Sequence, residues 1–295
     1  MKLKQKLAIN YIRARLNILS LVSPKTAAQK AFDLFCTPMQ RSGKKTSAIF
    51  QKGEKLSFRL DNHTVRGHRW FPAQTPDSQV RRVLIAHGFE SNSRNFEQYV
   101  TALLKKGYEV LAFDAPAHGQ SGGRQITIPL YVKTIQTIQE KYGPIHAWLG
   151  HSFGGLAISL FLESLDGEET ADESTTVPAP VKLALIAPVS EMTTAVRNFY
   201  HLLRLNEEVR KEFEELALET GGRPFSYYSL RRVLYQVTAD ILWVQDEEDK
   251  VTPLKDALLV KTDQHPNIQF LITSGLGHRK IYRDPEIIRQ VVEFL

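Results

Sequence analysis

The chain has 295 residues, of which 42% are hydrophobic and 24% are charged. These proportions are ordinary for a soluble globular protein and argue against collagen-like, disordered and membrane-embedded classes. The length predicts one large core domain with an insertion, not two domains of ordinary size. Cys36, the single cysteine, excludes an internal disulfide and fits a reducing compartment, so we expect a cytoplasmic protein.

The formal net charge of +6 comes from the N-terminal end of the chain. Residues 1–45 contain ten Lys and Arg residues and one acid, Asp33, which leaves a net charge of −3 on the rest of the chain. A mildly acidic body has no broad basic surface for a polyanion. We therefore expect no nucleic-acid partner.

The basic N-terminus predicts a helical extension over residues 1–45. Its apolar stretches are shorter than the about 7–15 residues of a signal-peptide core, and no segment approaches the about 18 apolar residues of a membrane-spanning helix. The residues that roughly share one helical face are Leu3, Leu7, Tyr11, Leu16 and Leu19. We favour packing of this helix on the chain's own domain with its basic face in solvent. Peripheral contact with an anionic membrane is the alternative.

Hydrophobic periodicity predicts the elements of the remaining chain. Alternating residues at Lys55 to Leu60 and Thr64 to Phe71 predict an antiparallel hairpin. Short apolar strands then alternate with amphipathic helices. The predicted strands are 83–86, 110–113, 145–149, 181–186, 241–245 and 268–272, and the predicted helices are 96–106, 126–142, 153–165, 254–262 and 285–294. This order predicts a mostly parallel α/β sheet with helices on both faces.

Two segments interrupt this alternation. Asp166 to Pro180 is acidic and almost devoid of apolar residues, which predicts a mobile surface loop. The segment at about 190–238 has helical periodicity and precedes the strand 241–245. An insertion at that point would overhang the carboxyl ends of the strands, where α/β sheets bind ligands, so we predict a helical cap. Its aromatic residues either line a pocket or pack the insertion itself: Phe199, Tyr200, Phe213, Phe225, Tyr227 and Tyr228.

Residues 150–154 read Gly150-His151-Ser152-Phe153-Gly154. A G-x-S-x-G pattern between a strand and a helix is the nucleophile elbow, a strained turn that lifts the serine oxygen clear of the sheet. The pattern is suggestive alone, and the predicted strand before it and helix after it make it specific. Ser152 is therefore the candidate nucleophile.

A serine hydroxyl needs a general base within hydrogen-bond reach and an acid that orients the base. His278 follows two glycines in the loop after the last predicted strand, and we expect it to be the base. Asp249 is the favoured acid, because its loop must reach the histidine before Pro253 starts the next helix. Asp246 is the alternative, and we expect the unused acids of this loop to face solvent.

The tetrahedral oxyanion of acyl transfer needs hydrogen-bond donors. The backbone N–H of Phe153, directly after the nucleophile, and that of Phe89, in the loop after the strand 83–86, are the candidates, and their side chains should line the acyl pocket. We expect His87 to make structural hydrogen bonds, since no cysteine or second histidine lies near it at metal-ligand spacing. No metal or cofactor is expected.

The chain resembles the α/β-hydrolase superfamily over residues 45–295. Five segments in order carry the resemblance: His87-Gly88-Phe89, Phe113 to Gly122, Gly150 to Gly155, Asp249 to Pro253, and Gly277-His278. The resemblance implies the α/β-hydrolase fold for residues 46–295 and a Ser-His-Asp triad of Ser152, His278 and Asp249. It implies little about the substrate.

The departures from the family pattern limit which branches of the α/β-hydrolase superfamily the chain resembles. Ala117-His118-Gly119 stands where the family often has Gly-His-Gly, a change that the turn tolerates. Because the elbow carries Ser152 and not an aspartate, the resemblance disfavours the dehalogenase and epoxide-hydrolase branches. The glycine-rich run of hormone-sensitive-type esterases is replaced by Phe89-Glu90-Ser91-Asn92.

The sequence therefore predicts a serine hydrolase that cleaves small-molecule carboxylic esters of small to medium acyl chain through an acyl-enzyme. A triad does not choose among leaving groups, so a thioesterase or a hydrolase of small peptides or amides is the first alternative. A non-catalytic ligand receptor on the same fold is disfavoured by the intact triad. A lipase that docks on membranes through its basic N-terminal helix is the third alternative.

Overall fold

The structure is a computed structural model that describes residues 3–39, 47–73, 80–166 and 181–295. The predicted acidic loop lies, after Asp166, outside the described residues. The described elements begin and end within about three residues of the predicted ones, since the hydrophobic runs that predict them are also the buried runs of the structure. The strand at 108–114, for example, is buried at every residue.

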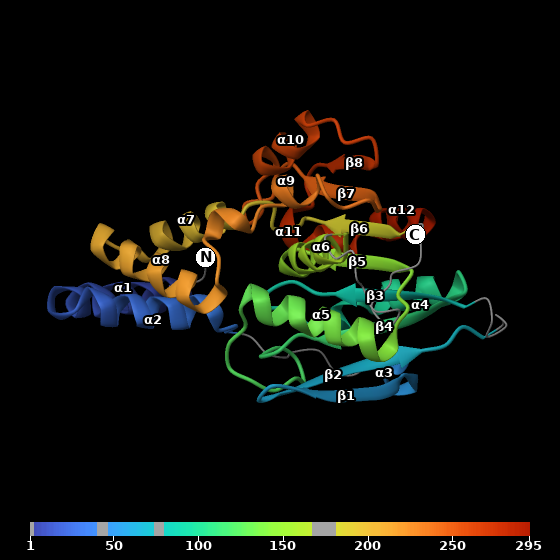
Figure 1. The fold of residues 1–295 in the computed structure, drawn as a ribbon, viewed down its shortest axis with the longest axis horizontal. Helices are drawn as coiled ribbons and strands as arrows, with labels where there is room; N and C mark the ends of the chain where they lie inside the picture. The colour runs from blue at the N-terminus through green and yellow to red at the C-terminus, as the bar shows by residue number, and fades with distance from the viewer. Residues whose placement is uncertain (1–2, 40–46, 74–79, 167–180) are drawn as a thin grey trace.

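One eight-stranded sheet forms the centre of the described chain (Figure 1). Its strands are β1 (Glu54–Leu60), β2 (His63–Trp70), β3 (Arg81–Ala86), β4 (Tyr108–Asp114), β5 (Ala147–His151), β6 (Lys182–Ile186), β7 (Asp240–Asp246) and β8 (Ile268–Thr273), in the order β1-β2-β4-β3-β5-β6-β7-β8. β2 pairs antiparallel with both β1 and β4, and the other neighbours are parallel. The predicted hairpin and mostly parallel sheet are confirmed.

Helices cover both faces of the sheet. One face carries α5 (Ile128–Tyr142), α6 (Phe153–Asp166) and α10 (Leu254–Thr262), and the other carries α3 (Ala48–Lys52), η2 (Ser93–Phe96), α4 (Glu97–Lys105), η4 (Ile281–Arg283) and α12 (Pro285–Phe294). Successive strand residues point to opposite faces, so Leu84 joins the first core while Val83 joins the second. Both faces of the sheet are therefore covered by helices, as a parallel sheet requires.

A helical insertion separates β6 from β7. It spans residues 187–239 and contains α7 (Met192–Leu203), α8 (Glu207–Gly221), η3 (Phe225–Tyr227) and α9 (Leu230–Val233). The N-terminal helices α1 (Leu3–Val22) and α2 (Pro24–Cys36) pack on it, α2 along α8 and α1 against both α2 and α7. Figure 1 shows α1, α2, α7 and α8 together on the left of the view, beside the sheet. We refer to these four helices as the helical lobe.

The lobe has an aromatic core built from both segments. Phe213 of α8 is fully buried and meets the rings of Phe32 and Phe35 of α2 edge to face, with ring centroids 5.3 and 5.7 Å apart. Such contacts add to the free energy gained from burial alone. Chain segments about 180 residues apart in sequence therefore depend on each other for their packing.

The predicted packing face of α1 is wrong in part. Leu16 is buried as expected, but Leu7 and Tyr11 are exposed. Leu16 lies five positions after Tyr11, a step that rotates by about 140° beyond one full helical turn. The two side chains therefore cannot share a narrow face. The inward face is formed by Leu16 with Ile12 and Leu19.

Replacement of Phe213 by alanine should lower the free energy of unfolding by about 3–5 kcal/mol, because it leaves a cavity at the junction of α2 and α8. Urea unfolding followed by circular dichroism measures the change. Leu218→Ala is the matched control, since Leu218 lies on the same helix and is half exposed. Equal losses for the two variants would contradict the packing of the lobe described above.

Candidate active site

Ser152 occupies a strained turn between β5 and α6. Its φ is +53°, a left-handed conformation that non-glycine residues rarely adopt. Two glycines permit the turn. A Cβ on Gly150 would come within 2.5 Å of Gly155 Cα, and a Cβ on Gly154 within 2.4 Å of the carbonyl oxygen of Ala86. The predicted elbow is therefore present as a backbone feature, and strain of this kind gathers at functional sites.

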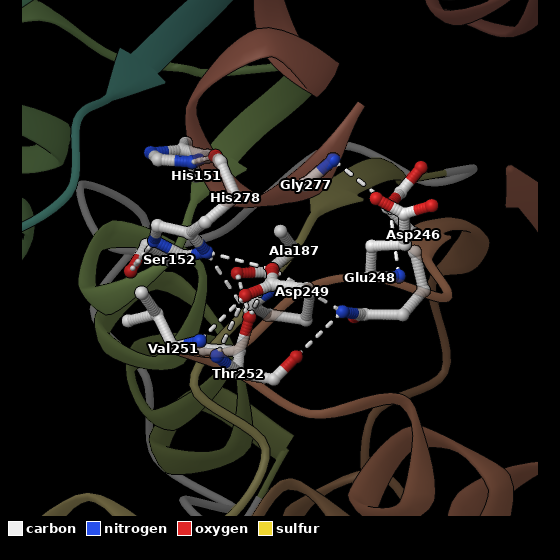
Figure 2. Close-up of polar contacts among 12 residues, drawn as sticks. His151, Ser152, Ala187, Asp246, Glu248, Asp249, Val251, Thr252, Gly277 and His278 are labelled. Atoms are coloured by element: carbon white, nitrogen blue, oxygen red, sulfur yellow. Dashed lines mark hydrogen bonds and ion pairs between the residues drawn. The ribbon is translucent and has the colours of Figure 1, made fainter. Parts of the chain in front are cut away.

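Three side chains from the ends of three strands meet at this turn (Figure 2). His278 Nε2 lies 3.0 Å from Ser152 Oγ. On the other side of the imidazole ring, His278 Nδ1 lies 2.8 Å from Asp249 Oδ2. Ser152 follows β5, Asp249 lies in the loop after β7, and His278 is the second residue of the short helix α11 (Gly277–Lys280) after β8. The order nucleophile, base, acid required for serine catalysis is thus available within hydrogen-bond distances.

Asp249 is held by its own loop as well as by the histidine. The backbone amides of Val251 and Thr252 donate to Oδ1 at 2.8 and 3.0 Å, and Thr252 Oγ1 lies 2.8 Å from Oδ2. Burial alone would raise the pKa of Asp249, but the hydrogen bond and charge of His278 and the bonds from Thr252 outweigh it and lower the pKa. The carboxylate is therefore ionised at neutral pH.

Asp246 has a different role from the one expected for an unused acid. The expectation that it faces solvent is wrong, because its side chain is fully buried. Its carboxylate accepts bonds from the amides of Glu248, Leu276 and Gly277 and from the Thr273 hydroxyl, at 2.8 to 3.1 Å. Burial tends to raise the pKa of Asp246, and the bonds from Gly277, Thr273, Leu276 and Glu248 outweigh it and lower the pKa. Asp246 thus ties together the loops that carry Asp249 and His278.

His151 also contacts the loop that carries His278. It is buried, and its Nε2 lies 3.2 Å from the carbonyl oxygen of His278. Burial, and then the charge of His278, lower the pKa of His151 well below its ordinary value. A neutral ring can donate its Nε2 proton to that carbonyl. The second residue of the elbow pattern therefore has a positioning contact that the sequence pattern alone did not predict.

The backbone amides of Phe89 and Phe153 have no protein acceptor among the described residues. Both residues line the same cavity as Ser152, and their rings meet edge to face. The loop of Phe89 is fixed by the next residue, because the Glu90 amide donates to His118 Nε2 at 3.2 Å while His118 Nδ1 donates to the Pro116 carbonyl. The turn after β4 thus positions the loop after β3.

His87 makes structural hydrogen bonds, as predicted. Its Nδ1 donates to the Gly88 carbonyl at 2.8 Å, and its Nε2 accepts from the Ala115 amide at 3.0 Å. Full burial lowers its pKa, so the ring is neutral. Asp114, the residue before Ala115, accepts from the amide and hydroxyl of Ser93, both at 2.8 Å. Among the described residues no group of three or more His, Cys, Asp and Glu side chains is arranged to hold a metal ion.

A cavity of about 690 Å³ opens above Ser152. Apolar side chains from three parts of the chain dominate its lining. Phe89 and Val189 line it from loops and Phe153 from the start of α6. The insertion contributes Met192, Phe199, Phe225 and Tyr228, and α2 and the segment after it contribute Phe32, Phe35 and Met39. The contribution of the N-terminal helices was not predicted, because periodicity places residues on a helix face but does not identify the partner of that face.

The aromatic residues of the insertion take one or both of the roles that the sequence left open, and Tyr227 packs on Tyr228 without lining the cavity. Phe199, Phe225 and Tyr228 line the cavity. Tyr200 and Phe213 pack the lobe instead, with their rings 5.3 Å apart. The insertion therefore has its own core and also presents rings to the cavity that contains Ser152.

An elbow serine at the carboxyl end of a parallel strand, in this sheet order, defines the α/β-hydrolase class. The sequence profile of the family "Hydrolase_4: Serine aminopeptidase, S33" matches residues 77–243, more than half of the chain. The chain belongs to this family of α/β hydrolases.

The chain is also similar to several solved structures and, over a short stretch, to one curated protein. Esterase Pf2001 of Pyrococcus furiosus is 20% identical with a TM-score of 0.58, over 88% of this chain and 96% of that chain. Est1E of Butyrivibrio proteoclasticus, solved with ferulic acid bound, is 18% identical with a TM-score of 0.62, over 81% of this chain and 97% of that chain. The uncharacterized protein YqkD of Bacillus subtilis (strain 168) is 31% identical over 87 residues, which are 28% of this chain and 27% of that protein. The structural likeness shows the shared fold.

Replacement of Asp246 by asparagine should reduce kcat about 10- to 100-fold with little change in KM, because one acceptor oxygen cannot hold both loops and His278 shifts. The free energy of unfolding should fall by about 1–3 kcal/mol at neutral pH. Since the folded pKa is lowered, this stabilisation is present above the ordinary carboxyl pKa of about 3.9 and is lost as the pH falls through the folded value, so wild type and variant should converge in acid.

Steady-state kinetics with a chromogenic ester and urea unfolding at several pH values measure these effects. Glu247→Gln is the control, since Glu247 is the exposed neighbouring acid. A stability loss with unchanged kcat would mean that Asp246 supports the fold without positioning His278.

Proposed function

We propose that the protein is a serine carboxylic-ester hydrolase that acts on esters of small to medium acyl chain through an acyl-enzyme intermediate. One observation carries the proposal: the unbroken series of contacts from Asp249 through His278 to Ser152 ends at the floor of a large apolar cavity. Family membership and the likeness to esterase structures support it.

The proposed reaction follows the geometry of the three side chains. Ser152 Oγ attacks the ester carbonyl while His278 Nε2 takes the hydroxyl proton, and Asp249 keeps the imidazole in the tautomer that can accept it. The amides of Phe89 and Phe153 would hold the oxyanion. His278 then gives the proton to the leaving alkoxide, which departs as an alcohol. A water molecule, deprotonated by the same histidine, cleaves the acyl-enzyme and releases the acid.

The charge of the cavity favours an ester over a peptide with a free amino group. An aminopeptidase needs an uncompensated acid for the substrate's ammonium group. Glu90 is the only acid among the described lining residues, and Arg279 Nη2 lies 3.6 Å from its carboxylate. Apolar walls suit an acyl chain, and the insertion and α2 would together form the cap that encloses it. Thioesters satisfy the same geometry and are the second candidate substrates.

A fluorophosphonate probe should label the wild-type protein at Ser152, and Ser152→Ala should abolish both labelling and ester hydrolysis. Gel fluorescence and mass spectrometry of the labelled peptide measure the site. Ser164→Ala is the control, because Ser164 lies on α6 away from the catalytic cavity. Labelling that persists in Ser152→Ala would place the nucleophile elsewhere.

Replacement of Phe225 by alanine should shift the preferred acyl chain toward longer p-nitrophenyl esters while turnover continues, since the ring fills part of the cavity. A panel from acetate to palmitate measures the shift, and wild type should prefer short to medium chains. Tyr235→Ala is the control, an exposed aromatic of the same insertion that does not line the cavity. An unchanged profile for Phe225→Ala, or a palmitate optimum for wild type, would refute size selection by the cap.

A further inference from the structure

Helix α1 carries a second apolar face that no described part of the protein covers. Its inward face is buried around Leu16, and a separate stripe faces solvent on the opposite side. The stripe consists of Leu7, Tyr11, Ile18, Leu21 and Val22, which are 61 to 87% exposed. At 3.6 residues per turn these positions fall within an arc of about 100°. An exposed, contiguous apolar stripe of this kind marks an interaction surface.

Basic residues border the stripe. Lys6 and Arg13 lie along one side of it on the helix, and Arg15 lies along the other. The helix contains no acidic residue between Leu3 and Val22, and Lys25 continues the basic character at the start of α2. Apolar residues in the centre with cations at the border form the pattern of a helix that lies in the interface of an anionic membrane.

The same charge pattern disfavours a second copy of this chain as the occupant. Two α1 helices packed about a two-fold axis would bring the basic borders of the two helices together with no acid on either helix to compensate. Like charges facing each other across an apolar contact destabilise it. Anionic lipid headgroups supply the missing negative charge.

One residue of the stripe, Tyr11, lies close to the cavity that contains Ser152. Tyr11 lines a groove between α1 and α2, and this groove shares Leu34 and Thr37 with the cavity that contains Ser152. Arg13 Nε donates at 2.7 Å to the carbonyl of Leu202, another residue of the cavity lining. A surface bound by α1 would therefore adjoin the cavity.

The turn between α1 and α2 presents the most exposed part of the stripe. Leu21 and Val22 are 87% and 83% exposed there. Cys36, at the other end of α2, accepts a backbone bond from Ile126, so the turn lies at the far end of the lobe from the sheet (Figure 1). The described residues contain no helix that is long and apolar enough to cross a bilayer. Contact through α1 would be peripheral.

We propose that α1 docks the protein on anionic membrane surfaces, with the stripe in the headgroup region and Lys6, Arg15 and Lys25 facing the lipid phosphates. The enzyme then takes its ester substrate from the membrane through the adjoining cavity. The substrate route rests on the proposed ester hydrolysis, whereas the docking does not.

Vesicle sedimentation tests the docking in the Ser152→Ala background, which removes any hydrolysis of lipid. The probes are vesicles of phosphatidylcholine, with and without about a third phosphatidylglycerol, at about 0.1 M and 0.5 M salt. We expect binding to the anionic vesicles that weakens at high salt. Ile18→Asp with Leu21→Asp should weaken it by at least about tenfold, because the stripe loses its buried apolar area. Lys6→Gln with Arg15→Gln should reduce the preference for anionic lipid.

Leu259→Asp is the matched control, since it replaces an exposed leucine on α10 and should leave binding unchanged. In the catalytically intact protein, the Ile18/Leu21 variant should still hydrolyse soluble p-nitrophenyl butyrate but lose hydrolysis of the same class of ester dispersed in anionic vesicles. Both positions lie outside the residues that line the cavity.

Three results would overturn the proposal. The first is the absence of wild-type binding to anionic vesicles. The second is binding that is equal for both lipids and unaffected by the stripe variant. The third is a wild-type dimer in analytical ultracentrifugation that the stripe variant converts to a monomer without any vesicle binding, which would make the stripe an interface between copies. Failure to hydrolyse the soluble ester, with docking intact, would refute the proposed function and support docking alone.

Discussion

The site depends on how closely β3, β5 and β6 pack around one strained residue. Ser152 adopts a left-handed backbone, and its amide donates to the carbonyl of Ile186 at the end of β6, 3.1 Å away. On the other side, the Gly154 Cα is so close to the end of β3 that a Cβ would overlap the Ala86 carbonyl. Because strand spacing is fixed by the hydrogen bonds of the sheet, the position of the Ser152 side-chain oxygen is fixed as well. The loops that follow β7 and β8 are arranged around that point.

Two buried carboxylates, those of Asp249 and Asp246, hold these loops close to Ser152. Asp249 contacts the imidazole directly, whereas Asp246 accepts bonds from the backbone on both sides and holds the two loops together. Each is stabilised as an anion by several donors, which is the condition under which a buried charge does not destabilise a fold. His151 adds a contact to the backbone of the loop that carries His278.

The lobe completes the cavity from two segments that lie far apart in the sequence. The rings of Phe32 and Phe35 pack on Phe213 of α8, and α2 also provides cavity walls. Helix α2 therefore lines the cavity that contains Ser152 and also belongs to the basic N-terminal part of the chain. Helix α1 is apolar on two faces. One face packs on the rest of the protein, and the other is exposed and available to bind a surface.

The sequence was sufficient to predict the sheet, its flanking helices and the three side chains that meet at the elbow. These follow from hydrophobic periodicity and from a turn whose glycines are dictated by close packing. The burial of Asp246 could not be predicted, since an acidic cluster after a strand does not reveal which carboxylate points inward. The outward stripe of α1 and the cavity walls from α2 were missed for a related reason: their faces are defined by tertiary partners far away in the chain.

The most direct test of the account is a crystal structure of the protein after reaction with a medium-chain alkyl phosphonate ester. We expect phosphorus bonded to Ser152 Oγ, a phosphonyl oxygen about 3 Å from the amides of Phe89 and Phe153, and the alkyl chain between α2 and the insertion. Phosphorus on another side chain, or an alkyl chain outside the cavity, would contradict it.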